Sequence, residues 1–481
     1  MRPYFAIAMT LAVIAVSFGV LGLARQGVTV TQTHVGATPV TSYQAGHADG
    51  PVVVMAHGFA GSQQMMQGYA LTLARAGYRV FVYEFEGHGR HPLPMSGDVS
   101  QIDGTTRLLM HQTRAVLDAV AIKGAPTALL GHSVATDILV RSAADRQDIG
   151  PVVLISAFSQ AITPQTPTDL LLITGAWEPG LRAFGLDAVQ MVTPDATEGQ
   201  TAVGDGVSRR TVVAPFAEHV SVLHSRVGRQ AALQWLDQSY GRSSDITIWP
   251  TGWAILGVLA GVVVLFRPIA ATLPCAPART QLRPRQLTWV ILVPAVITPL
   301  IAVPIPLDLL PVLVADYLAL HLLIFGAVQL AFLRYWRVGL GPGSRRAFGL
   351  TLLWCALFGG ALNQYAANFW PTSGRAWIIA AMMVGTLPYM LADTALTAQA
   401  SLVRRVFIRA GFLVSLGGAV ALDFDALFFL VMIAPVLVLF YLAFGTMGRF
   451  VSARAGPVAP GIALGLVLAW ALGVSFPLFQ P

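Results

Sequence analysis

A serine between small residues is the strongest chemical signal in the sequence. An apolar stretch, Thr-Ala-Leu-Leu, runs directly into Gly131-His132-Ser133-Val134-Ala135. In a tight turn between a strand and a helix, small neighbours let the two elements approach, and the serine Oγ projects above the sheet. The amide of Val134, at the start of the helix, would then point at a developing oxyanion. The motif predicts that Ser133 is a nucleophile for acyl transfer.

A second loop upstream fits the same chemistry. The apolar run Val52–Ala56 is followed by His57-Gly58-Phe59, and Gly61 comes two residues later. Glycines let a backbone turn close to a substrate. We therefore expect the amide of Phe59 to be the second oxyanion donor, with His57 and Gly58 shaping the loop. Taken alone, the pattern is equally compatible with an ordinary turn.

A histidine in the last part of this region is the candidate general base. His219 follows the short apolar run Thr211–Ala214 and precedes a helical pattern. At that place it can take the proton of Ser133 and later give it to the leaving group. His224 lies five residues later, and we expect it to pack or to face solvent.

The acid that orients the histidine has two candidates. Glu178 comes just after the apolar run Leu170–Thr174, where such an acid belongs. Asp187 lies further on, in a helical stretch, and is the reserve candidate. Asp169 precedes the run and so lies at the wrong end of the predicted strand. We expect Glu178 to hold the histidine tautomer and to stabilise the imidazolium.

The elements that must position these residues alternate between strands and helices. Apolar runs of strand length indicate strands buried on both faces, and the segments between them have helical periodicity. This alternation predicts a parallel, doubly wound sheet, with Val28–Tyr43 as an antiparallel pair at its edge. The predicted strands are Val52–Ala56, Arg79–Phe85, Thr127–Leu130, Val152–Ser156, Leu170–Thr174 and Thr211–Ala214; the predicted helices are Gln64–Ala76, Gly104–Ile122, Ser133–Asp148 and Ser221–Tyr240.

Residues 28–240 resemble the α/β-hydrolase superfamily, in particular its lysophospholipase and serine-aminopeptidase-like branch. The resemblance depends on the His57-Gly58 loop, the elbow around Ser133, the two later elements, and the block Tyr83-Glu-Phe-Glu-Gly-His-Gly-Arg90. It implies that this block is structural, so we assign no chemistry to Glu84 or His88 within it. Family members usually have Asp at the place of Glu178. Relatives often insert a cap after the nucleophile, and the short spacing here predicts an uncapped site.

The rest of the chain is apolar enough to need a membrane. Of the 481 residues, 55% are hydrophobic and 11% charged, against roughly 25% charged in soluble proteins. The run Tyr4–Leu23 is long enough to span a bilayer, so we expect an uncleaved anchor in 1–24 rather than a signal peptide. The α/β-hydrolase domain would occupy 25–248. An all-α domain of about eight spans would occupy 249–481, making about nine spans in all.

Charges between the apolar runs predict the topology. Arginines gather in alternate loops, as the positive-inside rule requires, and aspartates in the others, with Arg375 the one exception. The pattern places the N-terminus in the cytoplasm, and the hydrolase domain and C-terminus outside a bacterial-type plasma membrane. The arginines counted on the cytoplasmic side are Arg267, Arg279, Arg283, Arg285, Arg334, Arg337, Arg345, Arg346, Arg404, Arg405, Arg409, Arg449 and Arg454; the aspartates are Asp308, Asp423 and Asp425.

These residues predict a membrane-integral serine hydrolase that cleaves an ester, thioester or amide through an acyl-enzyme. Such chemistry requires no metal and no organic cofactor. A site without a cap, tethered at both ends to the membrane, favours a small or lipid-like acyl substrate in contact with membrane lipids. The net charge of +7 lies in membrane loops, so nucleic acid is not expected as a partner. Two alternatives stay open: an acyltransferase using the same residues, and a transport or signalling protein whose hydrolase-like domain only binds a ligand.

Overall fold

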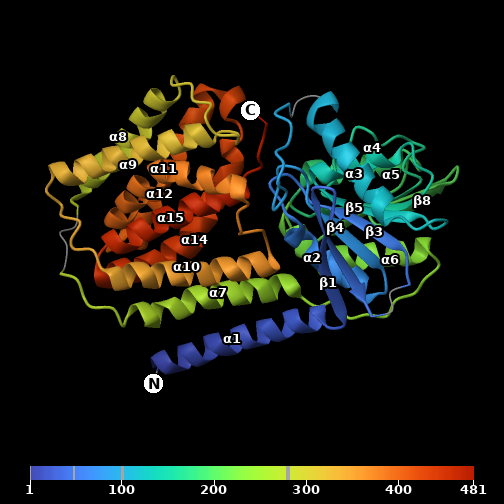
Figure 1. Ribbon diagram of the computed structural model, residues 1–481, viewed down its shortest axis with the longest axis horizontal. Helices are drawn as coiled ribbons and strands as arrows, with labels where there is room; N and C mark the ends of the chain where they lie inside the picture. Colours follow the sequence, from blue (N-terminus) through green and yellow to red (C-terminus); the bar gives the residue numbers. More distant parts are fainter. Residues whose placement is uncertain (1, 47–48, 99–101, 278–281, 481) are drawn as a thin grey trace.

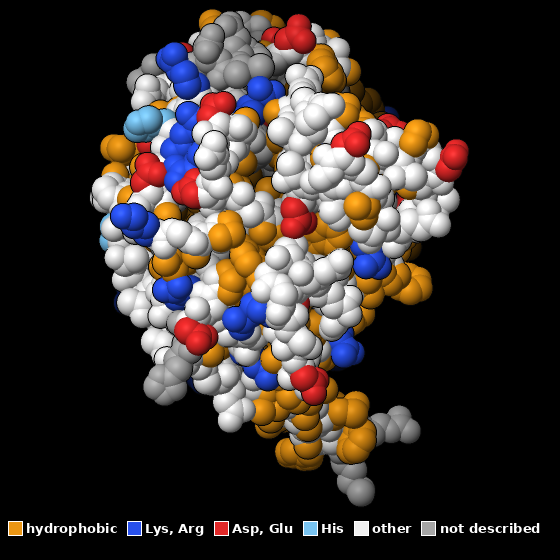
Figure 2. All heavy atoms as spheres, turned by 90° about the vertical axis from the view of Figure 1, so that its right-hand side faces the viewer, with side chains coloured by type: hydrophobic (Ala, Val, Ile, Leu, Met, Phe, Trp, Pro, Cys, Tyr) orange, Lys and Arg blue, Asp and Glu red, His pale blue; other side chains and the backbone are white. Residues whose placement is uncertain are grey.

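The chain folds into an α/β domain and a helical bundle that meet at one end of the bundle (Figure 1). The computed structural model describes residues 2–46, 49–98, 102–277 and 282–480. Charged side chains of both signs are spread over the face of the α/β domain that points away from the bundle (Figure 2). That face is therefore suited to water, whereas the opposite face is occupied by the bundle.

A sheet of nine strands, counted over the described residues, forms the centre of the α/β domain. Its order is β1-β2-β4-β3-β5-β6-β7-β9-β8. The strands from β4 to β9 in this order are parallel, and β1, β2 and β8 pair antiparallel at the two edges. The bounds are β1 Val28–Val35, β2 Thr38–Ala45, β3 Val52–Ala56, β4 Arg79–Tyr83, β5 Thr127–His132, β6 Ile149–Ile155, β7 Asp169–Gly175, β8 Thr201–Gly204 and β9 Val207–Ala214.

Helices cover both faces of the sheet, because successive side chains of a strand point to opposite faces. In β3, Val53 and Met55 pack in one apolar cluster and Val52 and Val54 in the other. The first cluster includes residues of α2 and α6, and the second includes residues of α3, α4 and α5. These helices are α2 Gln67–Arg75, α3 Arg107–Val120, α4 Val134–Ala143, α5 Pro179–Gln190 and α6 Arg226–Ser239. The prediction of a doubly wound sheet is confirmed.

Some predicted element bounds differ from the structure. The helix predicted over Ser133–Asp148 begins at Val134 and ends at Ala143. The short strand β8 was not predicted, because its pattern is exposed on alternate residues and contributes little to the core. Residues 156–168, between β6 and β7, form neither helix nor strand. The site therefore has no inserted cap at the place where relatives carry one.

Nine of the helices in the described ranges are long and apolar enough to cross a membrane. This number agrees with the prediction of about nine spans. The apolar part of α15 is mostly buried and that of α1 almost wholly exposed, so α15 lies inside the bundle and α1 at its edge. The helices are α1 Arg2–Arg25, α7 Thr251–Ala270, α8 Pro284–Ala302, α9 Ala315–Tyr335, α10 Arg345–Tyr365, α11 Ser373–Thr397, α12 Leu402–Leu422, α14 Leu430–Ala455 and α15 Val458–Ser475.

Helix α1 packs along α7 through glycines. A Cβ at Gly257 would come within 2.3 Å of the Ser17 Oγ, and one at Gly261 within 2.4 Å of Ile14. Glycines four residues apart let two helices approach closely, which is how helices associate where no water drives them together. The first helix is thus fitted to the bundle.

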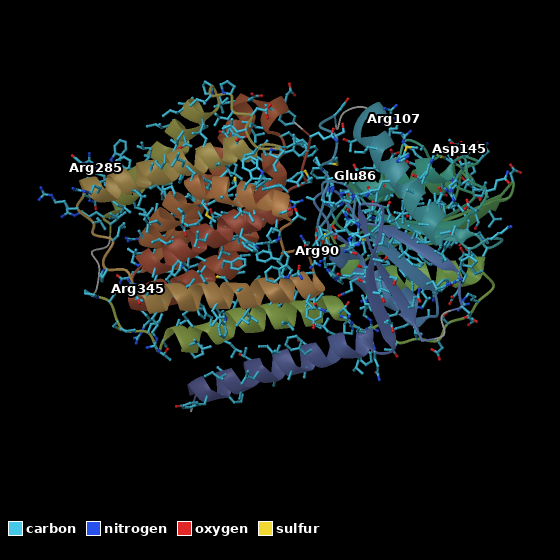
Figure 3. All side chains as sticks on the ribbon, viewed as in Figure 1. Glu86, Arg90, Arg107, Asp145, Arg285 and Arg345 are labelled. Atoms are coloured by element: carbon cyan, nitrogen blue, oxygen red, sulfur yellow. The ribbon has the colours of Figure 1, made fainter. Side chains whose placement is uncertain are left out.

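The arginines of the loops between spans lie at one end of the bundle. Arg285 and Arg345 lie at the end far from the α/β domain, and Arg90 lies at the junction (Figure 3). The chain enters the α/β domain from α1, and its C-terminal end also lies at the junction (Figure 1). Arg454, at the end of α14, donates to the carbonyls of Ala271 and Leu273 just after α7, so it lies at the same end as Arg285 and Arg345. Arg279, counted with them in the sequence, lies outside the described residues.

Two arginines depart from the loop pattern. Arg409 was counted as a loop charge but lies within α12, where its guanidinium donates to both carboxylate oxygens of Asp393 at 3.0 and 2.9 Å. Its role is therefore interhelical pairing. Arg375, the exception to the charge rule, is wholly buried at the start of α11 and donates to the carbonyls of Gly473, Phe476 and Gly87. It binds the bundle to the α/β domain.

The carboxyl edge of the sheet faces the bundle. The short helix η1, Gln63–Met66, follows the β3 loop and lies beside α10, and η3, Ser221–His224, follows the β9 loop and lies beside the start of α7. A Cβ at Gly252 of α7 would lie 2.7 Å from His224, which is half-buried there. Parallel sheets bind ligands at this edge. The candidate site residues therefore lie close to the ends of the spans.

Candidate active site

Ser133 occupies a sharp turn between β5 and α4. Its φ and ψ are 56° and −124°, a conformation that a residue with a side chain rarely adopts. The turn is held by a hydrogen bond from the Ser133 amide to the Ile155 carbonyl at 3.0 Å. A Cβ at Gly131 would lie 2.6 Å from Leu139 and 3.2 Å from the Ala135 carbonyl. The strained turn therefore needs the small residues of the motif, and it presents the Ser133 hydroxyl at the carboxyl edge.

The imidazole of His219 connects this hydroxyl to a carboxylate. Its Nε2 lies 2.9 Å from the Ser133 Oγ, and its Nδ1 lies 2.7 Å from the Glu178 Oε1. The Glu178 side chain is 6% exposed and that of His219 is 44% exposed. The structure thus brings the three predicted residues into one hydrogen-bonded row, with the acid buried and the base open to a substrate.

Glu178 is held in place by more than the histidine. Its Oε2 accepts hydrogen bonds from the Gly175 amide at 2.6 Å and from the Ser156 hydroxyl at 2.8 Å. Burial opposes its charged form, but the hydrogen bonds from His219, Gly175 and Ser156 outweigh burial and hold the pKa of Glu178 below its usual value. The carboxylate is therefore ionised and fixed. The reserve candidate Asp187 is exposed on α5.

Ser156 is a site residue that the sequence analysis missed. It follows β6 with a φ of 50°, and this turn directs its hydroxyl to Glu178. Its signal in the sequence is weak, since a polar residue at the end of an apolar run is common. Only the pairing of β6 with β7 brings it beside the acid.

The two candidate oxyanion donors lie on either side of the nucleophile. Val134 is the first residue of α4, and Phe59 follows Gly58 at the end of β3. A Cβ at Gly58 would lie 2.9 Å from the Ser133 Cβ, so the loop passes directly against the serine. Within the described part of the chain, neither amide donates to a protein acceptor. Strands β3 and β5 are neighbours at which the chain order reverses, the usual place for a ligand in an open α/β sheet.

The histidines adjoining the motifs are buried and structural. His57 accepts from the Phe85 amide at 3.2 Å, so its Nδ1 donates to the Gly58 carbonyl at 2.8 Å. The Nε2 of His132 lies 2.8 Å from the carbonyl oxygen of His219. Burial lowers the pKa of both His57 and His132 to about 4. Both are therefore neutral at ordinary pH and shape the loops.

Glu84 braces the loop that precedes Arg90. Its carboxylate accepts from the amides of Gln63 and Arg90 at 3.2 and 3.0 Å. The side chain is fully buried, and burial raises its pKa. A Cβ at Gly89, where φ is 48°, would overlap this carboxylate. The contacts agree with the structural role expected for this block.

Exposed apolar side chains lie close in sequence to Ser156, Glu178 and His219. Trp177, beside Glu178, is 65% exposed, and Phe216 and Val220, on either side of His219, are 84% and 46% exposed. Phe158, two residues after Ser156, is 58% exposed. So many exposed apolar side chains close together in sequence are typical of an interaction surface. We call Phe158, Trp177, Phe216 and Val220 the apolar rim.

Part of the α/β domain matches the model of a known protein family. Residues 48–234 match the family model for serine aminopeptidase, S33. The chain matches no curated protein sequence. Similar solved structures include a predicted CIB-like hydrolase from Thermoplasma acidophilum, with 14% identity, 44% of this chain and 100% of that chain covered, and a TM-score of 0.35. A dienelactone hydrolase from Anabaena variabilis has 18% identity, coverage of 45% and 98%, and a TM-score of 0.33.

The family match, the strand order and the strained serine turn define residues 48–234 as part of an α/β-hydrolase domain. Within that class, the family that this segment matches is serine aminopeptidase, S33. The domain is followed by eight of the nine apolar helices described above, which form a membrane-type bundle.

Proposed function

We propose that the protein is a membrane-integral serine hydrolase. The observation that carries the proposal is the row of hydrogen bonds from Ser133 through His219 to Glu178. His219 takes the Ser133 proton as the Oγ attacks the substrate carbonyl, and the amides of Phe59 and Val134 stabilise the oxyanion. His219 then gives the proton to the leaving alcohol, thiol or amine. Water, deprotonated by His219, releases the acid and restores the serine.

The same residues would transfer the acyl group to another acceptor if one displaced water, so acyl transfer is the closest alternative. The His219 side chain is 44% exposed, and water reaches it without passing a cap. This favours hydrolysis. A transport or signalling role for the whole chain would not need the buried, ionised Glu178, which serves only to orient an imidazole.

We infer that the substrate is lipid-like. The apolar rim borders the catalytic row, and the short helix after His219 packs beside the start of α7. Trp253, on the first turn of α7, is 78% exposed, as expected of a tryptophan at a membrane interface. The rim is therefore held near the level where the spans leave the bilayer. An acyl chain in contact with the apolar rim would reach Ser133 from the membrane surface.

We also infer that the hydrolase domain lies outside a plasma membrane. The arginine-rich loops share the end of the bundle opposite this domain, and such loops stay in the cytoplasm. Protease added to intact spheroplasts is expected to cleave the domain. Protection until the membrane is breached would reverse the assignment.

The first test is covalent labelling of the serine in membranes. A fluorophosphonate probe is expected to label the wild-type protein and to leave Ser133→Ala and His219→Ala unlabelled, because the probe reacts with a serine activated by its base. Labelling is read on a gel, with His111→Ala as a control at an exposed histidine of α3. A wild-type protein that is folded and never labelled would contradict the hydrolase proposal.

The second test concerns the apolar rim. The double variant Trp177→Ser and Phe216→Ser is expected to hydrolyse p-nitrophenyl palmitate dispersed in liposomes about tenfold more slowly, which corresponds to about 1.4 kcal/mol of lost contact between the acyl chain and the two rings. Hydrolysis of p-nitrophenyl acetate should be unchanged. Val203→Ser, at a 71% exposed position on the edge strand β8, is the matched control. Equal losses of rate on both esters would contradict the lipid-like substrate but not the catalytic role of Ser133, His219 and Glu178.

A further inference from the structure

The end of the chain leaves the bundle and pairs with the hydrolase domain. The Leu478 amide donates to the Gly87 carbonyl at 2.8 Å, and the Met95 amide donates to the Leu478 carbonyl at 2.8 Å. The Gln480 amide then donates to the Met95 carbonyl at 2.7 Å. Residues 478–480 therefore pair with Gly87 and Met95 of the hydrolase domain, through an isolated parallel bridge between Met95 and Phe479. A Cβ at Gly87 would lie 2.4 Å from the Leu478 carbonyl, so the close pairing requires glycine there.

The C-terminal segment, residues 478–480, places a ring beside Phe59. Phe479 is 4% exposed and belongs to the apolar cluster of the hydrolase domain. Its ring centroid lies 6.5 Å from that of Phe59. The Phe479 amide donates to the Pro311 carbonyl at 2.8 Å, in the loop between α8 and α9. Phe479 thus connects the loop between α8 and α9 to Phe59, the residue whose amide is a candidate oxyanion donor.

A second ring of the bundle contacts the same residue. Phe429, just before α14, lies 5.7 Å from the Phe59 ring, and His88 of the hydrolase domain lies 5.6 Å from it, edge to face. The Phe59 ring is therefore in contact with His88, Phe429 and Phe479. The next residue, Ala60, has a φ of 54°, a strained conformation that its surroundings must maintain.

We propose that the helical bundle completes the active site, with Phe429 and Phe479 as positioning residues for the Phe59 amide. The proposal rests on the proposed function, because it needs an oxyanion to bind. An oxyanion donor must be held within about 0.5 Å of its productive position. Losing one donor costs about 10²–10³-fold in kcat. The bundle therefore does more than anchor the domain: it sets the geometry of the loop that crosses Ser133.

The test compares full-length Phe479→Ala and Phe429→Ala with the wild-type protein in liposomes. Each variant is expected to lower kcat for p-nitrophenyl acetate about 10- to 100-fold while KM stays within about twofold, because the oxyanion exists only after attack. The affinity for a phenylboronic acid, which forms a tetrahedral adduct on serine, should fall by the same factor as kcat/KM. Phe479→Tyr and Phe429→Tyr should restore most of the activity.

The control is Phe424→Ala, at a 60% exposed phenylalanine of α13, Phe424–Leu427, whose ring packs on Phe428. It should behave as the wild-type protein. If Phe479→Ala does not fold, Phe429→Ala alone tests the proposal, since it leaves the C-terminal segment 478–480 unchanged. Folded variants with wild-type kcat and boronate affinity would overturn the positioning role, as would an equal loss in Phe424→Ala. A Ser133→Ala variant that keeps its activity would instead overturn the proposed function.

Discussion

Replacing Ser133 with alanine is expected to lower kcat for p-nitrophenyl acetate by about 10⁶-fold, and His219→Ala by a similar factor. The reason is that each residue is useless without the other. Without His219, the Ser133 hydroxyl has no acceptor for its proton, because the hydrogen bond of 2.9 Å to the His219 Nε2 is lost. Without the serine hydroxyl, the imidazole can activate only water.

The double variant is the decisive measurement. Because the two side chains act as one unit, combining Ser133→Ala with His219→Ala should cost no more than either change alone. The residual rate should still exceed that in water, since the oxyanion amides of Phe59 and Val134 remain. Losses that multiply in the double variant would mean that the two residues act independently. That result would contradict the proposal that Ser133 and His219 act together through their hydrogen bond.

The folded state of these variants can be checked separately. His219 follows β9, and its side chain is 44% exposed, so its removal leaves little buried surface behind. Thermal unfolding of His219→Ala should therefore match that of the wild-type protein within a few degrees. A large loss of stability would mean that the activity loss reports unfolding, and the boronate affinity would then separate the two effects.

The sequence predicts the carboxyl-edge residues well because chain order constrains them. Ser133 and His219 each follow an apolar run of strand length, and parallel strands place such residues at one edge of the sheet. For the acid, the sequence favours Glu178 because it comes directly after the predicted strand, and it leaves Asp187 as the reserve candidate because Asp187 also follows β7. Their separation depends on the start of α5 at Pro179, which leaves Glu178 at the strand end and carries Asp187 to an exposed face.

The contacts between the two domains could not be predicted. Phe479 lies 420 residues after Phe59, and nothing in either local pattern indicates that they meet (479 − 59 = 420). The role of Arg375 could not be predicted either. Its charge contradicts the topology rule in the sequence, and the structure explains it through carbonyl acceptors in both domains. Long-range packing of this kind is decided by tertiary structure, which periodicity does not report.

Glu178→Gln should retain the fold and lose about 10⁴-fold in kcat. The amide is close to the carboxylate in size, but it carries no charge to stabilise the imidazolium. It can also donate to His219 Nδ1 and select the wrong tautomer. The buried oxygens that accept from Gly175 and Ser156 make the orientation of the new amide ambiguous, because its NH₂ group cannot accept either hydrogen bond. The measurement is kcat for p-nitrophenyl acetate in liposomes.

The matched control is Asp187→Asn, which makes the same chemical change on the exposed face of α5. It should leave kcat within about twofold of the wild-type value, since surface changes away from a site have little effect. Ser156→Ala should fall between the two. It removes one of the hydrogen bonds that hold the pKa of Glu178 down, but it leaves His219 Nδ1 with its acceptor. A loss in Asp187→Asn as large as that in Glu178→Gln would move the acid to α5. It would also mean that the hydrogen bond of 2.7 Å between His219 and Glu178 is not the one that catalysis uses.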